Sequence, residues 1–569
     1  MLTFVSASAE IFSLGAVVPF IGILTQPEQV LESSVISGFV RSIGITDPQD
    51  LVIPLTMIFG IAAVISGALR LALLAVTISI SNATGSDLSI EVYRRTLYQP
   101  YRVHVSRSSG EIIAGITLKV TGASGVLMSL TKIVTSGILF VSILSTLLVI
   151  DPRIAGAAVL IFGLGYATIA MLTKYRLKRN SILIAAEQTT VVKVLQEGLG
   201  AIRDVLLDGT QKLYTNEYSK AILKLLRARG ENAFMHEAPR HLMESLGLVL
   251  VALGAWFFSL QPGSIGAALP ILGVIGLGAQ RLLPLMQQFY GNWAAVAGTQ
   301  GALIDVLELL EQPLPDEAEA SPPAPMDFKE LLKFSDVRFR YDEAGPWVLD
   351  GMTLDIPHGS RIGFVGNTGS GKSTAMDLLM ALLDPTDGAI LVDGRPITDD
   401  LRRAWQRTLA HVPQTIYLAD ASIAENIAFG LPASEIDHSR VREAAEQAQI
   451  AEFVEGRPGG YASMVGERGV RLSGGQRQRI GIARALYKQA SILIFDEATS
   501  ALDSTTEAGV LSAIDGLDRE LTILIIAHRL TTLQDCDKIV LLDSGRIAAQ
   551  GTYDEFNSEP PAFDCVLNT

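Results

Sequence analysis

The octapeptide Gly366-Asn367-Thr368-Gly369-Ser370-Gly371-Lys372-Ser373 follows directly after the apolar run Arg361–Val365. The run predicts a buried strand, and the sequence from Lys372 onward predicts a helix. Glycines let the loop between them curl, so that its backbone N–H groups and the positive end of the helix face one point. This strand-loop-helix unit is typical of a phosphate-binding loop and predicts an α/β fold for this part of the chain.

The composition indicates a second, very different part. The chain has 569 residues, of which 49% are hydrophobic and 18% charged, whereas a soluble domain carries about 25% charged residues. The apolar excess lies before about residue 300. The net charge of -14 comes largely from the later half, so we expect no nucleic-acid partner. The two cysteines, Cys536 and Cys565, are expected to be free thiols.

Six apolar stretches approach the roughly 20 residues that cross a bilayer. They cover residues 1–24, 51–81, 133–150, 154–172, 242–260 and 265–285. No basic segment precedes the first stretch, so we interpret it as a true span rather than a cleaved signal peptide. Residues 1–311 are therefore predicted to be an all-α, six-helix transmembrane domain.

Basic residues gather in the two long connections, after the second and fourth stretches, and place them in the cytosol. Mixed apolar and charged periodicity predicts helices at residues 88–128 and 177–237, which would extend the membrane spans into the cytosol. Breaks near Gln99-Pro100-Tyr101 and Asp208-Gly209-Thr210 predict two docking helices, at about 97–105 and 205–218. The alternative is that these segments are ordinary solvated linker helices.

Two features of the membrane half bear on a ligand. Residues 27–45 form an amphipathic pattern, either a helix on the membrane surface or a loop helix packed on protein. Charges inside spans are costly, so Arg70 and Arg281 are candidates to line a cavity for an anionic substrate. The alternatives are a structural pair between Glu10 and Arg70, and snorkelling of Arg281 near a helix end.

Prolines and acids fill residues 312–325 and must end the last membrane-derived helix, so we take this segment as the linker to a domain at 326–569. In that domain Lys372 would reach the β- and γ-phosphates of a nucleotide. The apolar run 491–495 predicts a parallel strand that ends at Asp496, which together with the Ser373 hydroxyl suits Mg²⁺. Glu497 could orient or deprotonate the attacking water.

The pentapeptide Leu472-Ser473-Gly474-Gly475-Gln476, between the phosphate loop and Asp496-Glu497, resembles the signature of ATP-binding cassette (ABC) proteins. The resemblance implies an α/β P-loop nucleotide-binding domain that takes ATP and Mg²⁺. It gives Tyr341 an adenine-stacking role; the alternative is a core tyrosine. The implied ATP-binding set is Tyr341, Gly366, Asn367, Thr368, Gly369, Ser370, Gly371, Lys372, Ser373 and Thr374; the catalytic set Glu497, His528 and Gln414; the Mg²⁺ ligands Ser373, Gln414 and Asp496; and the interface residues Glu467 and Asp503.

By the same resemblance, the pentapeptide covers the ATP of a partner subunit. One membrane half with one cassette is half of a transporter, and the intact Glu497 and signature favour a homodimer. The domain order resembles the exporter type of ABC transporter, an ATPase coupled to transport. This implies a multi-pass protein of the bacterial inner membrane with its cassette in the cytosol.

Several membrane-half stretches resemble the bacterial lipid-linked oligosaccharide flippases of protein N-glycosylation. They are 9–12 with 18–21, 110–113, 238–240 and 280–284. Residues 78–86 depart from that pattern because they are uncharged. The resemblance implies an amphipathic or lipid-linked substrate, membrane lipid as a partner, and pyrophosphate contacts from Arg70 and Arg281. The alternatives are a multidrug or lipid exporter and a peptide exporter of the same architecture.

Overall fold

The computed structural model describes residues 2–12, 52–150, 152–259, 265–315, 318, 320–496, 520–527 and 530–558, with the single residues 509, 512 and 516. The chain divides into two compact units, residues 1–99 with 103–315, and residues 316–569 with Pro100–Arg102. The amphipathic segment 27–45 lies outside the described residues, as do Glu497, Asp503 and His528.

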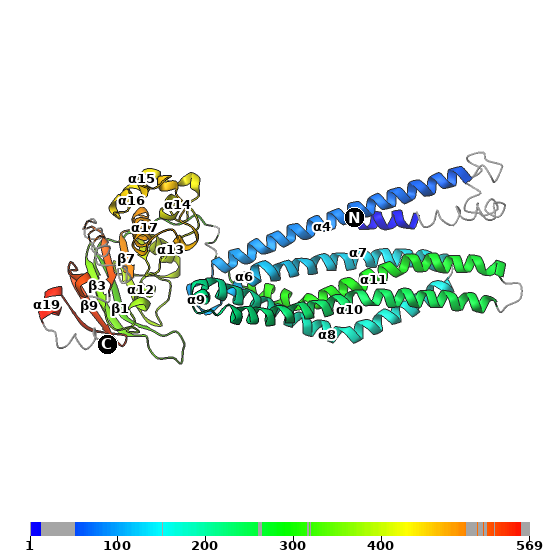
Figure 1. Ribbon diagram of the computed structural model, residues 1–569, viewed down its shortest axis with the longest axis horizontal. Coiled ribbons are helices and arrows are strands. Elements are labelled where there is room, and N and C mark those ends of the chain that lie inside the picture. The colour runs from blue at the N-terminus through cyan, green and yellow to red at the C-terminus, as the bar shows by residue number, and fades with distance from the viewer. Residues whose placement is uncertain are drawn as a thin grey trace. The chain divides into compact units, whose positions relative to one another are not determined.

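Long helices make up the described part of the first unit, and they run alongside one another (Figure 1). Four of them have 46 to 49 residues, or about 70 Å at 1.5 Å per residue. This length exceeds the roughly 30 Å of a bilayer core twofold, so the spans continue as helices outside it, as the sequence predicts. The helices are α4 (Val52–Leu97), α5 (Tyr101–Ser106), α6 (Ser109–Ala114), the π-helical turn η2 (Gly115–Lys119), α7 (Val120–Ile150), α8 (Pro152–Gly200), α9 (Ile202–Leu207), α10 (Gln211–Ser259) and α11 (Ile265–Leu310).

The expected spans fall on these helices. Within the described residues, Val52–Leu97, Ser109–Ser145 and Leu282–Leu310 are long and apolar enough to cross a membrane, and a shorter apolar helix covers Leu2–Phe12. The stretches expected at 133–150, 154–172, 242–260 and 265–285 lie in or largely in α7, α8, α10 and α11. The remainder of the first stretch, after residue 12, is outside the described part.

The two short helices expected for docking are present, but one prediction is wrong in position. Helix α5 overlaps the expected 97–105. The second short helix, α9, ends at Leu207, before the Asp208-Gly209-Thr210 turn, whereas the sequence placed a helix at 205–218. The chain turns at Ala201 as well as at Gly209, which has a positive φ of 64°. Gly198 and Gly200, directly before Ala201, were the available signal for this earlier break.

Small residues let α11 pack closely against its neighbours. A Cβ atom on Gly301 would lie 2.7 Å from the Ser181 carbonyl oxygen of α8, and one on Gly298 would lie 2.9 Å from Asn232 Nδ2 of α10. Further along the same helices, Phe162, Tyr290 and their neighbours form an apolar cluster that joins α8, α10 and α11. These contacts fix the register of the bundle.

Charged side chains tie the helices together in the same unit. Glu10, on the helix 2–12, pairs with Arg70 of α4, which is the structural pair that the sequence offered as an alternative. Lys119 Nζ lies 2.5 Å from Asp305 Oδ2 on α11. Arg95 donates hydrogen bonds of 2.7 and 2.9 Å to the carbonyl oxygens of Leu310 and Gln312. Arg95 therefore caps the carbonyl end of α11, which stops before the prolines as predicted.

The second unit is built on two sheets. A four-stranded antiparallel sheet has the order β2-β1-β4-β5, and a six-stranded sheet has the order β10-β9-β3-β8-β7-β6. The strands are β1 (Leu331–Phe339), β2 (Leu349–Pro357), β3 (Arg361–Val365), β4 (Asp387–Val392), β5 (Arg395–Pro396), β6 (Leu409–Val412), β7 (Ile492–Asp496), β8 (Thr522–Ile526), β9 (Lys538–Asp543) and β10 (Arg546–Gly551). The helices are α12 (Lys372–Leu379), α13 (Asp399–Thr408), α14 (Ile423–Ile427), α15 (His438–Gln447), α16 (Ala451–Glu455), α17 (Gly474–Tyr487) and α19 (Tyr553–Ser558).

Side chains that alternate along each strand feed two cores, one on each face of the larger sheet. In β7, Leu493 and Phe495 enter a core with α14 to α17, whereas Ile492 and Ile494 enter a core with α12 and the four-stranded sheet. Figure 1 shows α14 to α17 gathered on one side of the strands. Both faces of β7 are thus buried, which explains its unbroken apolar sequence.

The Glu10–Arg70 pair generates a stability prediction. The Glu10 side chain is 6% exposed, so Arg70→Gln should remove the positive charge opposite a buried carboxylate and cost on the order of 2 kcal/mol of stability. Glu10→Gln with Arg70→Gln should recover most of the loss, measured by thermal unfolding in detergent. A double variant as unstable as Arg70→Gln, or a single variant that unfolds normally but loses transport, would contradict a structural role for the pair.

Candidate nucleotide-binding site

The phosphate loop has the curled conformation that its glycines predict. It joins β3 to α12, and Gly366, Gly369 and Gly371 have positive φ angles of 150°, 84° and 102°. A Cβ on Gly366 would lie 2.1 Å from the Leu542 carbonyl oxygen, and one on Gly371 would lie 2.9 Å from that of Val348. At each of these two positions a backbone carbonyl oxygen lies closer than 3.0 Å, so no other residue type fits without moving the backbone.

Lys372 lies inside the curl of this loop. Its side chain is buried, and its ammonium group donates hydrogen bonds of 2.7 and 2.9 Å to the carbonyl oxygens of Gly366 and Asn367. The positive charge is thus held among the loop amides at the N-terminus of α12. Ser373, the next residue, is exposed. The two side chains therefore present a cation and a hydroxyl at the place where the helix begins.

Strand order and register bring the other predicted segments to the same edge of the sheet. Strand β8 pairs in parallel with β3 and with β7, so that Ile526 lies opposite both Phe364 and Asp496. Two interstrand spacings of about 4.8 Å separate Phe364 from Asp496. Strand β6 pairs in parallel with β7, with Val412 opposite Phe495. Asp496, the start of the phosphate loop and the residues after Val412 therefore meet at the carboxyl ends of the strands.

The described segments that directly precede the predicted catalytic residues end at this edge of the sheet. Gln414 lies two residues beyond the end of β6, and Glu497 directly follows Asp496. His528 directly follows Ala527, which continues β8 and whose N–H donates to the Phe364 carbonyl. The side chains of Glu497 and His528 are outside the described residues, so only their points of attachment are placed.

The donor set fits Mg²⁺ held jointly with a nucleotide. A protein binds this ion through one or two carboxylates or hydroxyls and leaves its other positions to phosphates and water. Asp496 offers a carboxylate and Ser373 an exposed hydroxyl on the same edge. Among the described residues there is no group of three or more His, Cys, Asp or Glu side chains able to hold a metal by themselves.

Tyr341 lies beyond β1 with its ring accessible. The residue is 44% exposed, which contradicts the alternative of a core tyrosine. Its hydroxyl lies 3.3 Å from Thr374 Oγ1 on α12, and its ring contacts Phe339 edge-on at 5.0 Å between centroids. The ring is therefore held beside the phosphate loop with surface left for a flat partner.

Asp377 is a residue at this site that the sequence analysis missed. It lies one helical turn after Ser373 on α12, and the spacing of four places both on one face. Burial, and then repulsion from Asp496, raise the pKa of Asp377 to about 6. The helical spacing from Ser373 was the available signal, but nothing in the sequence placed α12 against the end of β7.

The signature segment forms the start of α17. Ser473 is the N-cap: its hydroxyl accepts from the Gln476 N–H at 3.3 Å, and Gln476 Oε1 accepts from the Ser473 N–H at 2.9 Å. This capping box holds the helix terminus in shape. Leu472 is buried in the core, whereas Ser473 and Gly474 are exposed. The positive end of the helix thus faces outward, as an anion site would require.

Glu467 is also exposed. It begins the short helical turn η6 (Glu467–Gly469), and the following Arg468 has a positive φ of 52°. The predicted interface partner Asp503 is outside the described residues.

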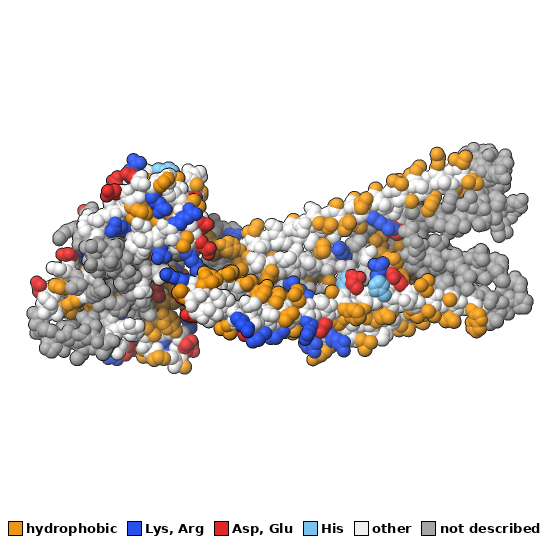
Figure 2. Space-filling view, viewed as in Figure 1, with side chains coloured by type: hydrophobic (Ala, Val, Ile, Leu, Met, Phe, Trp, Pro, Cys, Tyr) orange, Lys and Arg blue, Asp and Glu red, His pale blue; other side chains and the backbone are white. Residues whose placement is uncertain are grey.

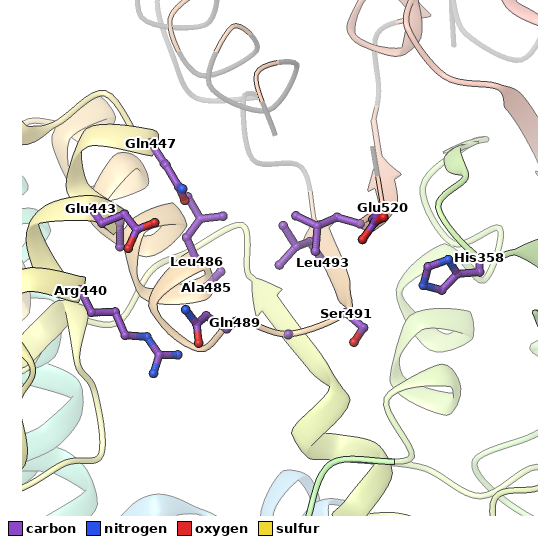
Figure 3. A pocket seen from close by; sticks show the side chains of 13 residues that line it. His358, Arg440, Glu443, Gln447, Ala485, Leu486, Gln489, Ser491, Leu493 and Glu520 are labelled. Atoms are coloured by element: carbon purple, nitrogen blue, oxygen red, sulfur yellow. The ribbon is translucent and has the colours of Figure 1, made fainter. Parts of the chain in front are cut away.

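A polar cavity of about 350 Å³ lies at the opposite edge of the sheet and has no part in this site. Ser491 and Leu521, which precede β7 and β8, contribute to it. Figure 3 shows Arg440 and Glu443 of α15 on one side and Glu520 on the other.

In the membrane half, the structure gives different outcomes for the two candidate substrate residues. Arg70 is engaged with Glu10. Arg281 lies on α11, and its side chain is outside what the structure describes.

Comparisons with known proteins agree with this geometry. The family description "ABC transporter" matches residues 349–500, and "ABC transporter transmembrane region" matches residues 14–263. An ATP-dependent lipid A-core flippase of Chromohalobacter salexigens is 32% identical over 84% of this chain and 82% of its own. The heterocyst differentiation ATP-binding protein HepA of Nostoc sp. is 33% identical over 79% of this chain and 72% of its own.

The fold also matches a solved structure. A bacterial Atm1-family ABC exporter with ATP bound has a TM-score of 0.77 and 23% identity, with 97% of this chain and 95% of that chain covered. The chain therefore belongs to the ABC transporter family. It is an integral membrane protein in which a helical transmembrane domain precedes an ATP-binding cassette, and it is an ATP-driven translocase. Its fold is that of an ABC exporter.

The Asp377 carboxyl generates a pH prediction. Its pKa is raised from 3.8 to about 6, so its ionisation destabilises the folded cassette increasingly from about pH 4 to pH 6 and fully above that. Asp377→Asn should raise the melting temperature of nucleotide-free protein in EDTA at pH 7.5, and by about half as much at pH 5. Asp342→Asn, at an exposed aspartate, is the control. A shift independent of pH would contradict the assignment.

Proposed function

We propose that two copies of this chain form a homodimer that flips an amphipathic lipid across the bacterial inner membrane at the expense of ATP. The observation that carries the proposal is the exposed N-terminus of α17 in a chain with one membrane half. A capped helix end that presents Ser473 and Gly474 outward suits the phosphates bound by a second cassette. The proposal of a lipid as the substrate rests on the relatives named lipid A-core flippases.

In the proposed dimer, each ATP lies between two cassettes. On one side the Lys372 ammonium and the loop amides hold the β- and γ-phosphates, and Ser373, Gln414 and Asp496 hold Mg²⁺. On the other side the partner's signature segment, corresponding to Leu472–Gln476, closes the site. Asp503 and Glu467 lie at the interface.

The proposed hydrolysis uses residues at the carboxyl edge of the sheet. Glu497 orients and deprotonates the attacking water, and His528 holds the γ-phosphate. Gln414 contacts Mg²⁺, and its amide can donate and accept at once, which suits a link between nucleotide and membrane domain. ATP binding joins the cassettes, and hydrolysis releases them.

We further propose the domain limits 1–311 for the membrane domain, 312–325 for the linker and 326–569 for the cassette. Helices α5 and α9 are the proposed docking elements that convert cassette closure into movement of the membrane helices. Because α4, α8, α10 and α11 are each continuous over 46 to 49 residues, they can carry a displacement at their cytosolic ends into the membrane.

Glu497 provides the test of turnover. Glu497→Gln keeps the shape of the side chain but removes the base, so ATP hydrolysis should fall by about 10²- to 10⁴-fold while ATP still binds. Hydrolysis and binding of labelled ATP are measured on the same reconstituted preparation. Lys372→Ala is the reference variant, in which binding itself should be lost. Full hydrolysis by Glu497→Gln would remove this residue from the proposed role.

Tyr341 provides a test of base stacking. Tyr341→Ala should weaken ATP binding by about 1–3 kcal/mol, the usual worth of a base stacked on a ring. Tyr341→Phe retains the ring and loses only the hydroxyl contact with Thr374, so its affinity should stay close to that of the parent. Equal losses in both variants would assign the effect to the hydroxyl instead.

The lipid substrate is tested in proteoliposomes. ATP-dependent loss of outer-leaflet label is measured for a fluorescent lipid-linked glycan, a lipid A analogue, a plain phospholipid and a hydrophobic drug. Preference for either glycolipid supports a lipid-linked substrate, and their ratio separates the two flippase classes. Transport of the drug alone would replace the flippase with a multidrug exporter and leave the nucleotide chemistry unchanged.

A further inference from the structure

The helical unit contains an apolar cavity of about 500 Å³ between α7, α8 and α11. Aromatic rings from α8 and α11 and small residues from α7 and α8 line most of it. A Cβ atom added at Gly137 or at Gly163 would have no neighbour within 4 Å. The absence of side chains at these two positions therefore enlarges the cavity. The lining residues are Gly137, Phe140, Val141, Gly163, Tyr166, Ala167, Ala170, Leu285, Met286, Phe289, Tyr290 and Trp293.

One face of α8 leads from this cavity to a pair of lysines. Gly163, Ala167 and Ala170 line the cavity at spacings of four and three, and Lys174 and Lys178 continue the same stripe at spacings of four. Because α8 runs toward the cytosolic connection, the lysines stand at the cytosolic end of the cavity. Figure 2 shows Lys and Arg side chains gathered over α8, beside hydrophobic ones.

Lys174 lies within the headgroup layer, and Lys178 lies just outside that layer, within reach of its long side chain. They are two and six residues beyond the end of the apolar stretch at 172, or about 3 and 9 Å along the helix. The headgroup layer on each side of the bilayer core is about 5–8 Å thick. Both lysines are exposed, and neither makes an ion pair within the part of the chain that the structure describes. Their charge is therefore not satisfied by the helices around them.

We propose that this cavity binds a hydrocarbon chain of a lipid from the cytosolic leaflet, and that Lys174 and Lys178 bind the phosphate of its anionic headgroup. The aromatic and glycine lining accepts a flexible chain, and the paired cations favour a negative headgroup over a zwitterionic one. The inference rests on the proposed flipping of an amphipathic lipid and names the class of ligand: a lipid with a net negative phosphate headgroup.

Arg70 differs from these two lysines as a candidate anion-binding cation. Its charge is taken by Glu10, so it attracts an anion less than a lysine with no carboxylate beside it. The sequence analysis selected charges inside the spans, whereas this site uses charges just past the end of one. A headgroup can stay hydrated at that depth while only its chains enter the protein.

The experiment uses Trp293, which lines the cavity. Trp256→Phe leaves Trp293 as the only tryptophan of residues 1–311. The full chain is placed in phosphatidylcholine nanodiscs with a small fraction of chain-brominated phosphatidylglycerol or chain-brominated phosphatidylcholine. Bromine quenches tryptophan only on contact, so quenching reports chains inside the cavity. We expect half-quenching at a lower fraction of the brominated phosphatidylglycerol.

The following variants distinguish binding of the lipid's hydrocarbon chain from binding of its headgroup. Lys174→Gln and Lys178→Gln should each raise the half-quenching fraction of phosphatidylglycerol by about fivefold and leave phosphatidylcholine unchanged. Arg176→Gln, on another face of the same turn, should have little effect. Gly163→Leu fills the cavity and should abolish quenching by both lipids, whereas Gly156→Leu, with open space at its own Cβ position, should not.

Three outcomes would overturn the inference: no preference for phosphatidylglycerol, full quenching in Gly163→Leu, or no quenching at all, which would mean that a partner helix fills the cavity. Flipping and ATP hydrolysis are measured in parallel. Loss of flipping with normal lipid preference would refute the proposed function and keep the lipid site. Normal flipping without that preference would refute the site alone.

Discussion

The parallel alignment of β3, β8, β7 and β6 is the constraint on which the nucleotide site depends. It brings the phosphate loop, Asp496 and the residues after Val412 to one edge, although they are separated by up to 130 residues in the chain. The register cannot slip, because alternate residues of each strand belong to two different cores. A shift by one residue would exchange Phe364 with Val365 and place each side chain in the wrong core.

In the proposed dimer, one chain contributes halves of two nucleotide sites. The phosphate loop and the start of α17 are both positive helix ends that suit phosphate, and each is fixed by its own local device. Glycines with positive φ shape the loop, and the Ser473–Gln476 capping box shapes the signature. Both local structures are formed by residues of the chain itself, so neither segment needs a bound ligand in order to fold. In the proposed dimer, the phosphates of the nucleotide supply the negative charge that suits both helix ends.

In the membrane half, pairing decides which charges can attract a ligand. Glu10 with Arg70 and Lys119 with Asp305 hold helices together, and Arg95 caps the end of α11. Lys174 and Lys178 have no such partner among the described residues, and they stand beside an apolar cavity. A cation that already has its carboxylate contributes to stability. A cation that lacks one at the membrane surface is free to select the headgroup of a lipid.

The sequence by itself determined the local devices and the class of each half. The apolar stretches predicted the membrane spans, and the mixed apolar and charged periodicity after them predicted that the helices continue outside the bilayer. The phosphate loop and the signature predicted an ABC cassette. These patterns were readable because helix periodicity, glycine φ and capping act over a few residues. Only the tertiary structure decided which strands adjoin, that Asp377 lies near Asp496, and that Arg70 is engaged by Glu10. Those facts depend on contacts between residues far apart in the chain, which no short-range pattern encodes.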